Sequence, residues 1–297
     1  MTILHRSPNI LSLYRRALFA KGNGSAKGSA LPKLPTNRIT LANVQAETSK
    51  IAVYNKVCGF NQDNKQLPIS FPHIMAFPLH LELMLLKNFP FAVMGMVHIH
   101  NRITQHRAIQ PFEMMDLVCY FSDVRKTDKG YEIDIKTEVF ITGDKVWESV
   151  STNLVRKKTD VPAAEKNTDT AEAQLDHQEF WRLSTNLGRR YAAVSGDSNP
   201  IHLFNMSAKL FGFKGHIAHG MWTKARVAAA LYNKLDSEAC TISVDFKLPI
   251  FLPATVQLNH DLNFDNDTAA SERCINFEVK EEAGIKPHMK GFIRALG

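Results

Sequence analysis

The alternation of apolar and polar positions predicts β-strands along much of the chain. In the first half, residues 116–122, 131–141 and 146–155 alternate, and short turn-forming segments separate them at 128–130 and 142–144. Alternating runs joined by turns that contain Asp and Gly are typical of antiparallel hairpins with one buried face. Further strand-like runs occupy residues 91–103, 241–248, 255–262, 273–280 and 288–295. The pattern therefore predicts an antiparallel sheet in each half of the chain.

Two stretches interrupt these strands and predict helices. Residues 221–234 are rich in Ala, Leu, Met, Lys and Arg and contain neither Gly nor Pro, which favours a helix. The small residues Ala225, Ala228 and Ala229 indicate close packing of that helix against a sheet. An apolar stretch near residues 71–85 holds the corresponding place in the first half.

Similar landmarks recur in the two halves in the same order. The pattern Tyr-x-x-Val-x-Gly occurs at residues 54–59 and again at 191–196, and a His-Ile pair follows at 73–74 and at 216–217. An internal repeat of this size indicates duplicated domains. We expect a basic N-terminal arm, a first domain, a polar linker and a second domain, with the bounds 1–50, 51–158, 159–176 and 177–297.

Composition narrows the class of protein. The chain has 297 residues, of which 44% are hydrophobic and 22% charged, as in ordinary globular proteins. No apolar run reaches the ~18–20 residues of a membrane span, so we expect no stable membrane insertion. The four Cys residues are scattered without a CxxC pair. This spacing argues against a disulfide framework or a zinc site and favours a reducing compartment, the cytoplasm or alternatively the mitochondrial matrix.

The net charge of +7 belongs to the N-terminal arm. Residues 1–50 hold eight Lys and Arg residues and one acid, Glu47, and the rest of the chain has equal numbers of acids and bases. A nucleic-acid-binding function for the whole protein therefore loses its main support. Residues 8–20 form an amphipathic pattern that fits three interpretations: a mitochondrial presequence, a segment that meets a membrane surface or an acidic partner, or a helix that packs back on the domain. We expect removal of residues 1–30 to leave an active enzyme, with lower stability at most.

The candidate catalytic residues lie in the second domain, ahead of the predicted helix over residues 221–234. Asp197 and His202 are five positions apart in a segment of turn formers, so a folded loop can aim both side chains at one water. Such a carboxylate and imidazole can act as a general acid/base pair. Asn199, Ser195 and His219 are expected to support them. A hydrogen-bonded structural turn is the alternative interpretation.

Gly220 is expected at the N-terminus of the helix over residues 221–234. Backbone N–H groups at a helix N-terminus have no intrahelical partner and suit an oxygen that gains negative charge. Because His216 and His219 precede this helix with no Cys or carboxylate near them in the sequence, we expect no metal site.

This segment resembles the MaoC-like (R)-specific enoyl-thioester hydratase and dehydratase family. The family pattern is matched by Tyr191, Val194, Ser195, Gly196, Asp197, Asn199, Pro200, Ile201, His202 and Ala208, and by residues 217–221 downstream. The resemblance implies an α+β double hotdog fold, in which two antiparallel sheets each wrap around a central helix. It also implies a catalytic Asp/His pair and a Gly N–H that binds the thioester carbonyl. Members often carry a Ser inside the helix, where this chain has only Ala, around Ala228.

The first copy lacks these catalytic residues. Phe60 stands in the place of Asp197, and Phe77 is aligned with Gly220, so we expect a degenerate first domain and one working site per chain. The resemblance to double hotdog hydratases favours an acyl-tail pocket here, for which we nominate Phe71, Met75 and Phe77. Ordinary core packing is the alternative.

The resemblance, together with the Asp197 and His202 pair, implies a hydro-lyase of fatty acid metabolism. It would interconvert trans-2-enoyl and (R)-3-hydroxyacyl thioesters, linked to CoA or to an acyl carrier protein, with no cofactor. The alternatives are a hotdog acyl-thioesterase and a non-catalytic acyl-thioester binding protein. We expect a monomer, with the pseudo-dimer inside one chain, or a homodimer.

Overall fold

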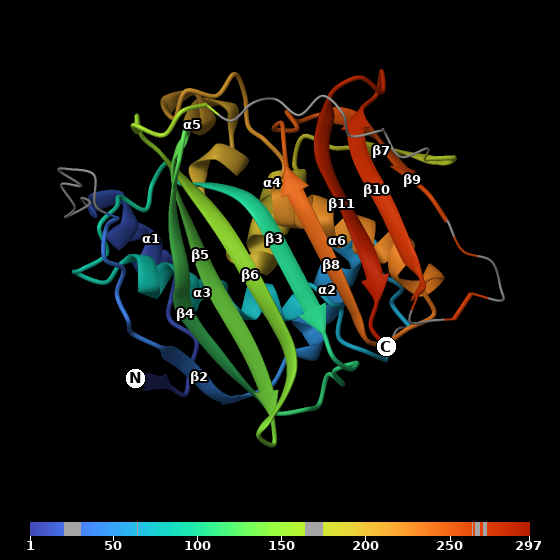
Figure 1. The fold of residues 1–297 in the computed structure, drawn as a ribbon, viewed down its shortest axis with the longest axis horizontal. Helices are drawn as coiled ribbons and strands as arrows, with labels where there is room; N and C mark the ends of the chain where they lie inside the picture. The colour runs from blue at the N-terminus through green and yellow to red at the C-terminus, as the bar shows by residue number, and fades with distance from the viewer. Residues whose placement is uncertain (21–30, 64, 164–174, 263, 265–267, 270–271) are drawn as a thin grey trace.

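One mixed sheet of eleven strands runs through the computed structural model (Figure 1). The structure describes residues 1–20, 31–63, 65–163, 175–262, 264, 268–269 and 272–297. The strand order is β1-β2-β4-β5-β6-β3-β8-β11-β10-β9-β7. All neighbours pair antiparallel except β1 and β2, which are parallel.

The two halves of the sheet come from the two halves of the chain. The first half-sheet contains β2 (Ile39–Val44), β3 (Val97–Gln105), β4 (Met115–Thr127), β5 (Gly130–Ile141) and β6 (Asp144–Arg156). The second contains β7 (His177–Leu183), β8 (Cys240–Phe246), β9 (Ala254–His260), β10 (Cys274–Glu281) and β11 (Pro287–Ala295). They join where β3 pairs with β8, with Ile103 opposite Ile242. Alternation along β5, whose odd-numbered residues are buried, explains why the strand prediction was accurate.

Each half-sheet curves around one buried helix. In the first half this is α3 (Phe71–Met84), and in the second it is α6 (Gly220–Leu231). Figure 1 shows α3 behind β4 and β5, and α6 behind β8 and β11. Ala225 and Ala228 of α6 are buried, and their small side chains let the helix pack closely. This is the predicted α+β double hotdog. None of the described helices is both long enough and apolar enough to span a membrane.

The repeat is visible in the helices that precede α3 and α6. Both α2 (Thr48–Cys58) and α4 (Leu187–Ser195) end at a glycine in the left-handed conformation, Gly59 with φ 82° and Gly196 with φ 79°. The tyrosines of the repeated pattern lie inside these helices, and their rings are 6.2 Å apart. The segment between α4 and α6 is twice as long as that between α2 and α3. It contains a 3-10 turn, η1 (Pro200–His202), and α5 (Asn205–Leu210); η2 (Tyr232–Lys234) follows α6.

The N-terminal arm takes part in the fold. Its residues form the edge strand β1 (Thr2–Leu4), α1 (Ile10–Phe19) and β2, which lies between β1 and β4. The sequence pattern predicted neither strand. Leu13 and Ala17 of α1 are buried in a cluster with Leu81 of α3, as in the packed-helix interpretation. Residues 21–30 of the arm and residues 164–174 of the linker lie outside the described residues.

Candidate active site

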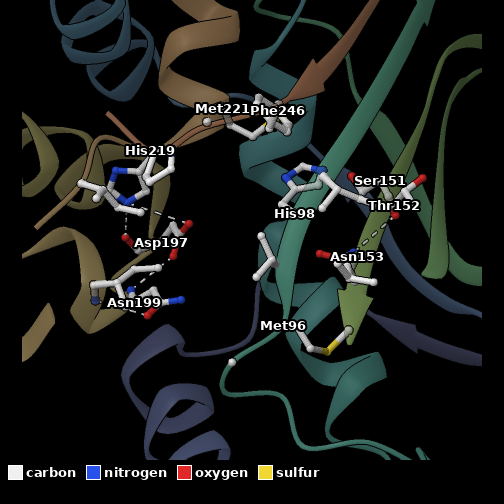
Figure 2. A pocket seen from close by; sticks show the side chains of 18 of the residues that line it. Met96, His98, Ser151, Thr152, Asn153, Asp197, Asn199, His219, Met221 and Phe246 are labelled. Atoms are coloured by element: carbon white, nitrogen blue, oxygen red, sulfur yellow. Dashed lines mark hydrogen bonds and ion pairs between the residues drawn. The ribbon is translucent and has the colours of Figure 1, made fainter. Parts of the chain in front are cut away.

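A pocket of about 1660 Å³ lies between the two halves. Its walls come from α1, α3, β3 and β6 on one side and from the α4–α6 segment on the other. Asp197, His202 and His219 line it, together with Gly220 at the start of α6. Figure 2 shows Asp197, Asn199 and His219 on one wall, with His98 and Asn153 on the facing wall.

Asp197 is held by the turn that ends α4. Gly196 terminates the helix, and the Asp197 N–H donates to Ser195 Oγ at 3.1 Å. The Asn199 N–H donates to Asp197 Oδ1 at 3.2 Å, while the Asn199 side chain accepts from the Ile201 N–H at 3.4 Å. Ser195 and Asn199 thus fix the Asp197 loop from both sides.

His202 ends η1 and is buried. Its Nδ1 lies 2.8 Å from the Ile217 carbonyl oxygen. Because a carbonyl oxygen only accepts, Nδ1 carries the proton and Nε2 offers a lone pair. Gly188 in α4 permits this placement, since a Cβ on it would lie 2.0 Å from the His202 carbonyl oxygen. His202 is therefore presented as a proton acceptor.

His219 connects the two candidate catalytic residues. Its ring stacks on that of His202 with centroids 3.7 Å apart, and Tyr191 packs on it at 4.9 Å. His219 Nε2 donates to the Asp197 carbonyl oxygen at 2.9 Å and lies 3.9 Å from Asp197 Oδ2. His219 thus braces the backbone of Asp197 and one face of His202.

The protonation states of Asp197, His202 and His219 follow from their burial and from the charges that they exert on one another. Burial opposes ionisation of Asp197, but His219, His202 and the Tyr14 hydroxyl together hold its pKa below the usual value. Burial lowers the pKa of His202, although the charge of Asp197 opposes this, and burial lowers that of His219 to about 3. At neutral pH the site therefore contains one carboxylate and two uncharged imidazoles.

Gly220 is the first residue of α6, and His219 is its N-cap. An α-helix leaves the N–H of its first residue without an intrahelical partner. A Cβ on Gly220 would lie 2.8 Å from the ring of Phe246, so glycine keeps this end of the pocket open. Thr223, one turn later, is buried, lines the pocket and donates to the His219 carbonyl oxygen at 3.4 Å. The helix α6 thus carries a hydroxyl at Thr223, whereas Ala228 has none.

Tyr14 of α1 is a site residue that the sequence pattern missed. Its hydroxyl donates to Asp197 Oδ1 at 2.7 Å across 183 positions of sequence. Burial, and then the charge of Asp197, raise the pKa of Tyr14, so the hydroxyl stays protonated. The expectation that residues 1–30 can be removed without loss of activity is therefore revised, because the deletion would remove this donor.

Tyr14→Phe is expected to lower kcat/KM for the reaction proposed below by roughly 10-fold or more, since hydrogen bonds to charged groups contribute about 1.5–3 kcal/mol. Without the donor, the pKa of Asp197 rises and the acid side of the pH profile moves to higher pH. Tyr120→Phe, which removes a hydroxyl bonded to Glu138, is the matched control. An unchanged rate and pH profile would show that the contact between Tyr14 and Asp197 is only structural.

The nominated acyl-tail residues do not all face the pocket. Phe77 lines it, on the same face of α3 as Ile74, Leu81 and Met84. Phe71 and Met75 lie on the other face and pack into the core, where the Phe71 ring contacts Tyr54 edge-on at 5.2 Å. Their assignment to the pocket was wrong because α3 carries apolar residues on all of its faces, and such a sequence does not indicate which apolar face packs into the core.

Of the two residues aligned with catalytic ones, Phe60 holds the equivalent place in the fold and Phe77 does not. Phe60 follows the left-handed Gly59 as Asp197 follows Gly196, and its ring stacks on Tyr54 at 6.1 Å. Phe77 lies in the middle of α3, whereas Gly220 begins α6. The alignment of Phe77 with Gly220 was therefore wrong, and Phe71 occupies the first position of α3.

The fold brings three candidate metal ligands together, although their spacing in the sequence did not suggest it. Asp197, His202 and His219 offer ligand atoms within 4.8 Å of one another, so a carboxylate does lie beside His219. The two rings stack at 25°, and their lone pairs lie in the ring planes. That no metal is required stays a prediction.

Comparison with known proteins places this geometry in a family. Residues 166–281 match the family model described as MaoC like domain. The chain is 34% identical over 278 residues to 3-hydroxyacyl-thioester dehydratase X of Mycobacterium tuberculosis, covering 91% of this chain and 96% of that protein.

Solved structures agree with this match. The crystal structure of HtdX of Mycobacterium tuberculosis has a TM-score of 0.73 and 31% identity, covering 88% of this chain and 100% of that one. A MaoC-like dehydratase from Phytophthora capsici shares the fold, with a TM-score of 0.71 and 16% identity over 90% of this chain and 97% of that one. From the near-full-length match at 34% identity, we conclude that the chain belongs to the MaoC-like dehydratase family.

Proposed function

We propose that the protein catalyses the reversible hydration of trans-2-enoyl thioesters to (R)-3-hydroxyacyl thioesters. The observation that carries this proposal is the meeting of an ionised Asp197 and a lone-pair-bearing His202 in a pocket that the first N–H of α6 also lines. Similarity to a protein named 3-hydroxyacyl-thioester dehydratase supports the same reaction. CoA and acyl carrier protein are both candidate carriers.

Asp197 and His202 divide the proton chemistry of hydration. A water that donates to the Asp197 carboxylate and to His202 Nε2 is aimed at C3 of the enoyl group. As its oxygen bonds to C3, one proton passes to Nε2, and the imidazolium returns it to C2 on the same face. Asp197 remains ionised and stabilises the imidazolium between these steps. Atoms balance, because one water adds across the C2–C3 double bond.

The Gly220 N–H stabilises the negative charge that this addition creates. Attack at C3 moves electrons through C2 to the thioester oxygen, which gains negative charge as an enolate. A donor already oriented by the helix N-terminus stabilises that oxygen without reorganisation. Thr223 lies one turn further along the same wall.

Product analysis tests the proposed reaction. Crotonyl- and octenoyl-CoA and their acyl-carrier counterparts are incubated with the protein, and products are separated on a chiral phase. (R)-3-hydroxyacyl thioester is expected. Free thiol and carboxylic acid would instead identify a thioesterase, which attacks C1, and binding without turnover would identify an acyl-thioester binding protein.

The rate is expected to depend on pH through Asp197 and His202. The reactive form has an ionised Asp197 and a neutral His202, and the pKa of each lies below its ordinary value of 3.8 or 6.5. Activity is therefore present above these values and is lost as protons are added. The profile of kcat/KM should be level at neutral pH and fall only below about 6.5. A fall centred at pH 7 or above, with the fold intact by circular dichroism, would contradict these assignments.

Phe77→Trp is expected to shift preference toward short acyl chains. Phe77 lines the pocket beside Leu81 and Met84, and a larger ring would shorten the apolar space. Relative to crotonyl-CoA, kcat/KM for long enoyl-CoA should fall roughly tenfold or more. Phe112→Trp at an exposed site is the control. An unchanged ratio of kcat/KM for long enoyl-CoA to kcat/KM for crotonyl-CoA would show that Phe77 only packs in the core.

A further inference from the structure

A group of basic side chains lies where the pocket meets solvent. The group comes from the turn between β4 and β5 and from the chain that leaves β6, and each member is exposed and lines the pocket that contains Asp197: Lys129, Arg156, Lys157 and Lys158. We call these four residues the basic rim. Within the described part of the chain, none of their side chains forms an ion pair or a hydrogen bond, whereas the neighbouring Arg125 pairs with Asp134. The basic rim is therefore a local excess of positive charge at the entrance to the site.

Acidic residues of the same wall do not cancel this charge. The first half of the chain contributes two acids to the lining of the pocket, Asp128 and Glu132. Glu132 lies 3.5 Å from a guanidinium nitrogen of Arg125, so its charge is already partly compensated. Four bases thus face Asp128 and a paired Glu132.

The backbone holds the basic rim together. The Lys157 N–H donates to the Lys129 carbonyl oxygen at 3.3 Å, and Arg156 lies opposite Gly130 in the ladder between β5 and β6. Gly130 has φ 142°, and a Cβ on it would lie 2.0 Å from the Val155 carbonyl oxygen, so glycine lets the two segments approach. Like charges that the backbone fixes side by side repel one another, and an anionic partner relieves that repulsion.

An apolar surface adjoins the basic rim. Met206 and Leu210 on α5 are 83% and 85% exposed, and residues four apart lie on the same face of a helix. Phe211, the next residue, and Leu248 of the second half are also exposed and line the pocket. Figure 1 shows α5 at the same edge of the sheet as the end of β6. Exposed apolar side chains that gather in one place mark an interaction surface, so the pocket opens between a basic and an apolar surface.

This combination selects a protein as the carrier of the acyl group. A pantetheine arm has a phosphate at its far end both in CoA and on a carrier protein, so the basic rim by itself suits either. CoA ends in a charged nucleotide, which gains little from Met206 and Leu210. A carrier protein has a surface large enough to cover these side chains and can present acids to the bases, as in protein interfaces with an apolar centre and a charged periphery.

We propose that the basic rim and α5 together form the docking surface for an acyl carrier protein with an acidic face. This inference rests on the proposed hydration of enoyl thioesters and names the carrier that brings them. Acids of the carrier pair with the basic rim, and apolar side chains of the carrier cover Met206 and Leu210. The pantetheine arm passes between the two surfaces toward Asp197.

Paired substrates test the apolar part of this surface. The same octenoyl group is attached to CoA and to a bacterial acyl carrier protein, and kcat/KM for hydration is measured on both with the full-length protein. Met206→Ser combined with Leu210→Ser is expected to lower kcat/KM on the carrier-protein substrate by roughly tenfold or more, the scale on which interface side chains contribute. The value for octenoyl-CoA should not change. Phe112→Ser, at an exposed site outside the pocket, is the matched control and should change neither.

Binding without the arm tests the basic rim. The apo form of the same carrier protein has no pantetheine and no phosphate on it, so its dissociation constant reports contacts of the protein surface alone. Lys129→Glu, Lys157→Glu and Lys158→Glu combined are expected to weaken this binding by roughly tenfold or more, because charge complementarity governs association. Lys65→Glu, which reverses an exposed charge outside the pocket, is the matched control.

Several results would overturn the docking surface. They are hydration of octenoyl-CoA without hydration of the carrier-protein substrate, an α5 variant whose losses on the two substrates are equal or absent, and an apo carrier protein that binds the wild type and the charge-reversed variant equally or binds neither. Losses confined to octenoyl-CoA would assign the entrance to the nucleotide of CoA instead. A wild type that hydrates neither substrate contradicts the proposed function, while binding of the apo carrier protein still decides the docking surface.

Discussion

Asp197→Asn and His202→Gln are each expected to lower kcat for hydration by about 10²–10⁴-fold, the usual contribution of a positioned acid or base. Asparagine can still accept from Tyr14 and from the Asn199 N–H, the two donors to Asp197 Oδ1. Glutamine has no ring nitrogen of suitable basicity to take a proton from water. Both replacements nearly preserve shape, so the variants should fold and still bind the thioester.

The double variant sharpens this test. Two groups that hold one water act as a unit, so Asp197→Asn with His202→Gln should be little slower than the slower single variant. Asp63→Asn and His106→Gln, at sites away from the pocket, are controls for the substitutions themselves. A folded single variant that keeps more than about a tenth of the wild-type turnover, far short of the usual range, would remove its residue from the mechanism.

Local patterns predicted most of the fold and the centre of the site. Alternation found the strands because one face of each is buried, and the turn formers around Asp197 placed it on a loop. The double hotdog followed from the repeat together with the family resemblance. These features depend on residues close in sequence, where periodicity and turn chemistry act directly.

The missed features depend on contacts between distant segments. Tyr14 contacts Asp197 across 183 positions of sequence, and the residues around Tyr14 form no pattern typical of an active site. Phe71 and Met75 were misplaced because α3 carries apolar residues on all of its faces, so only tertiary packing decides which of them meet the pocket.

Gly220→Pro is expected to lower kcat by about 10²–10³-fold, the usual effect of losing one oxyanion donor. Proline removes the N–H that the mechanism assigns to the enolate oxygen. It is well tolerated at the first position of a helix, and Gly220 occupies that position in α6. His219, with φ −71° and ψ 134°, already has the extended conformation that a residue before proline adopts. The backbone can therefore accept the change.

Gly220→Ala separates the lost donor from the added bulk. Alanine keeps the N–H but places a Cβ 2.8 Å from the Phe246 ring, a contact that proline also introduces. If the N–H stabilises the enolate, the proline variant should be slower than the alanine variant by most of the expected factor, with the difference in kcat and little of it in KM. Equal rates in the two variants would mean that Gly220 serves only to leave space beside Phe246, and the oxyanion donor would have to be sought elsewhere on the same wall, beginning with the Thr223 hydroxyl.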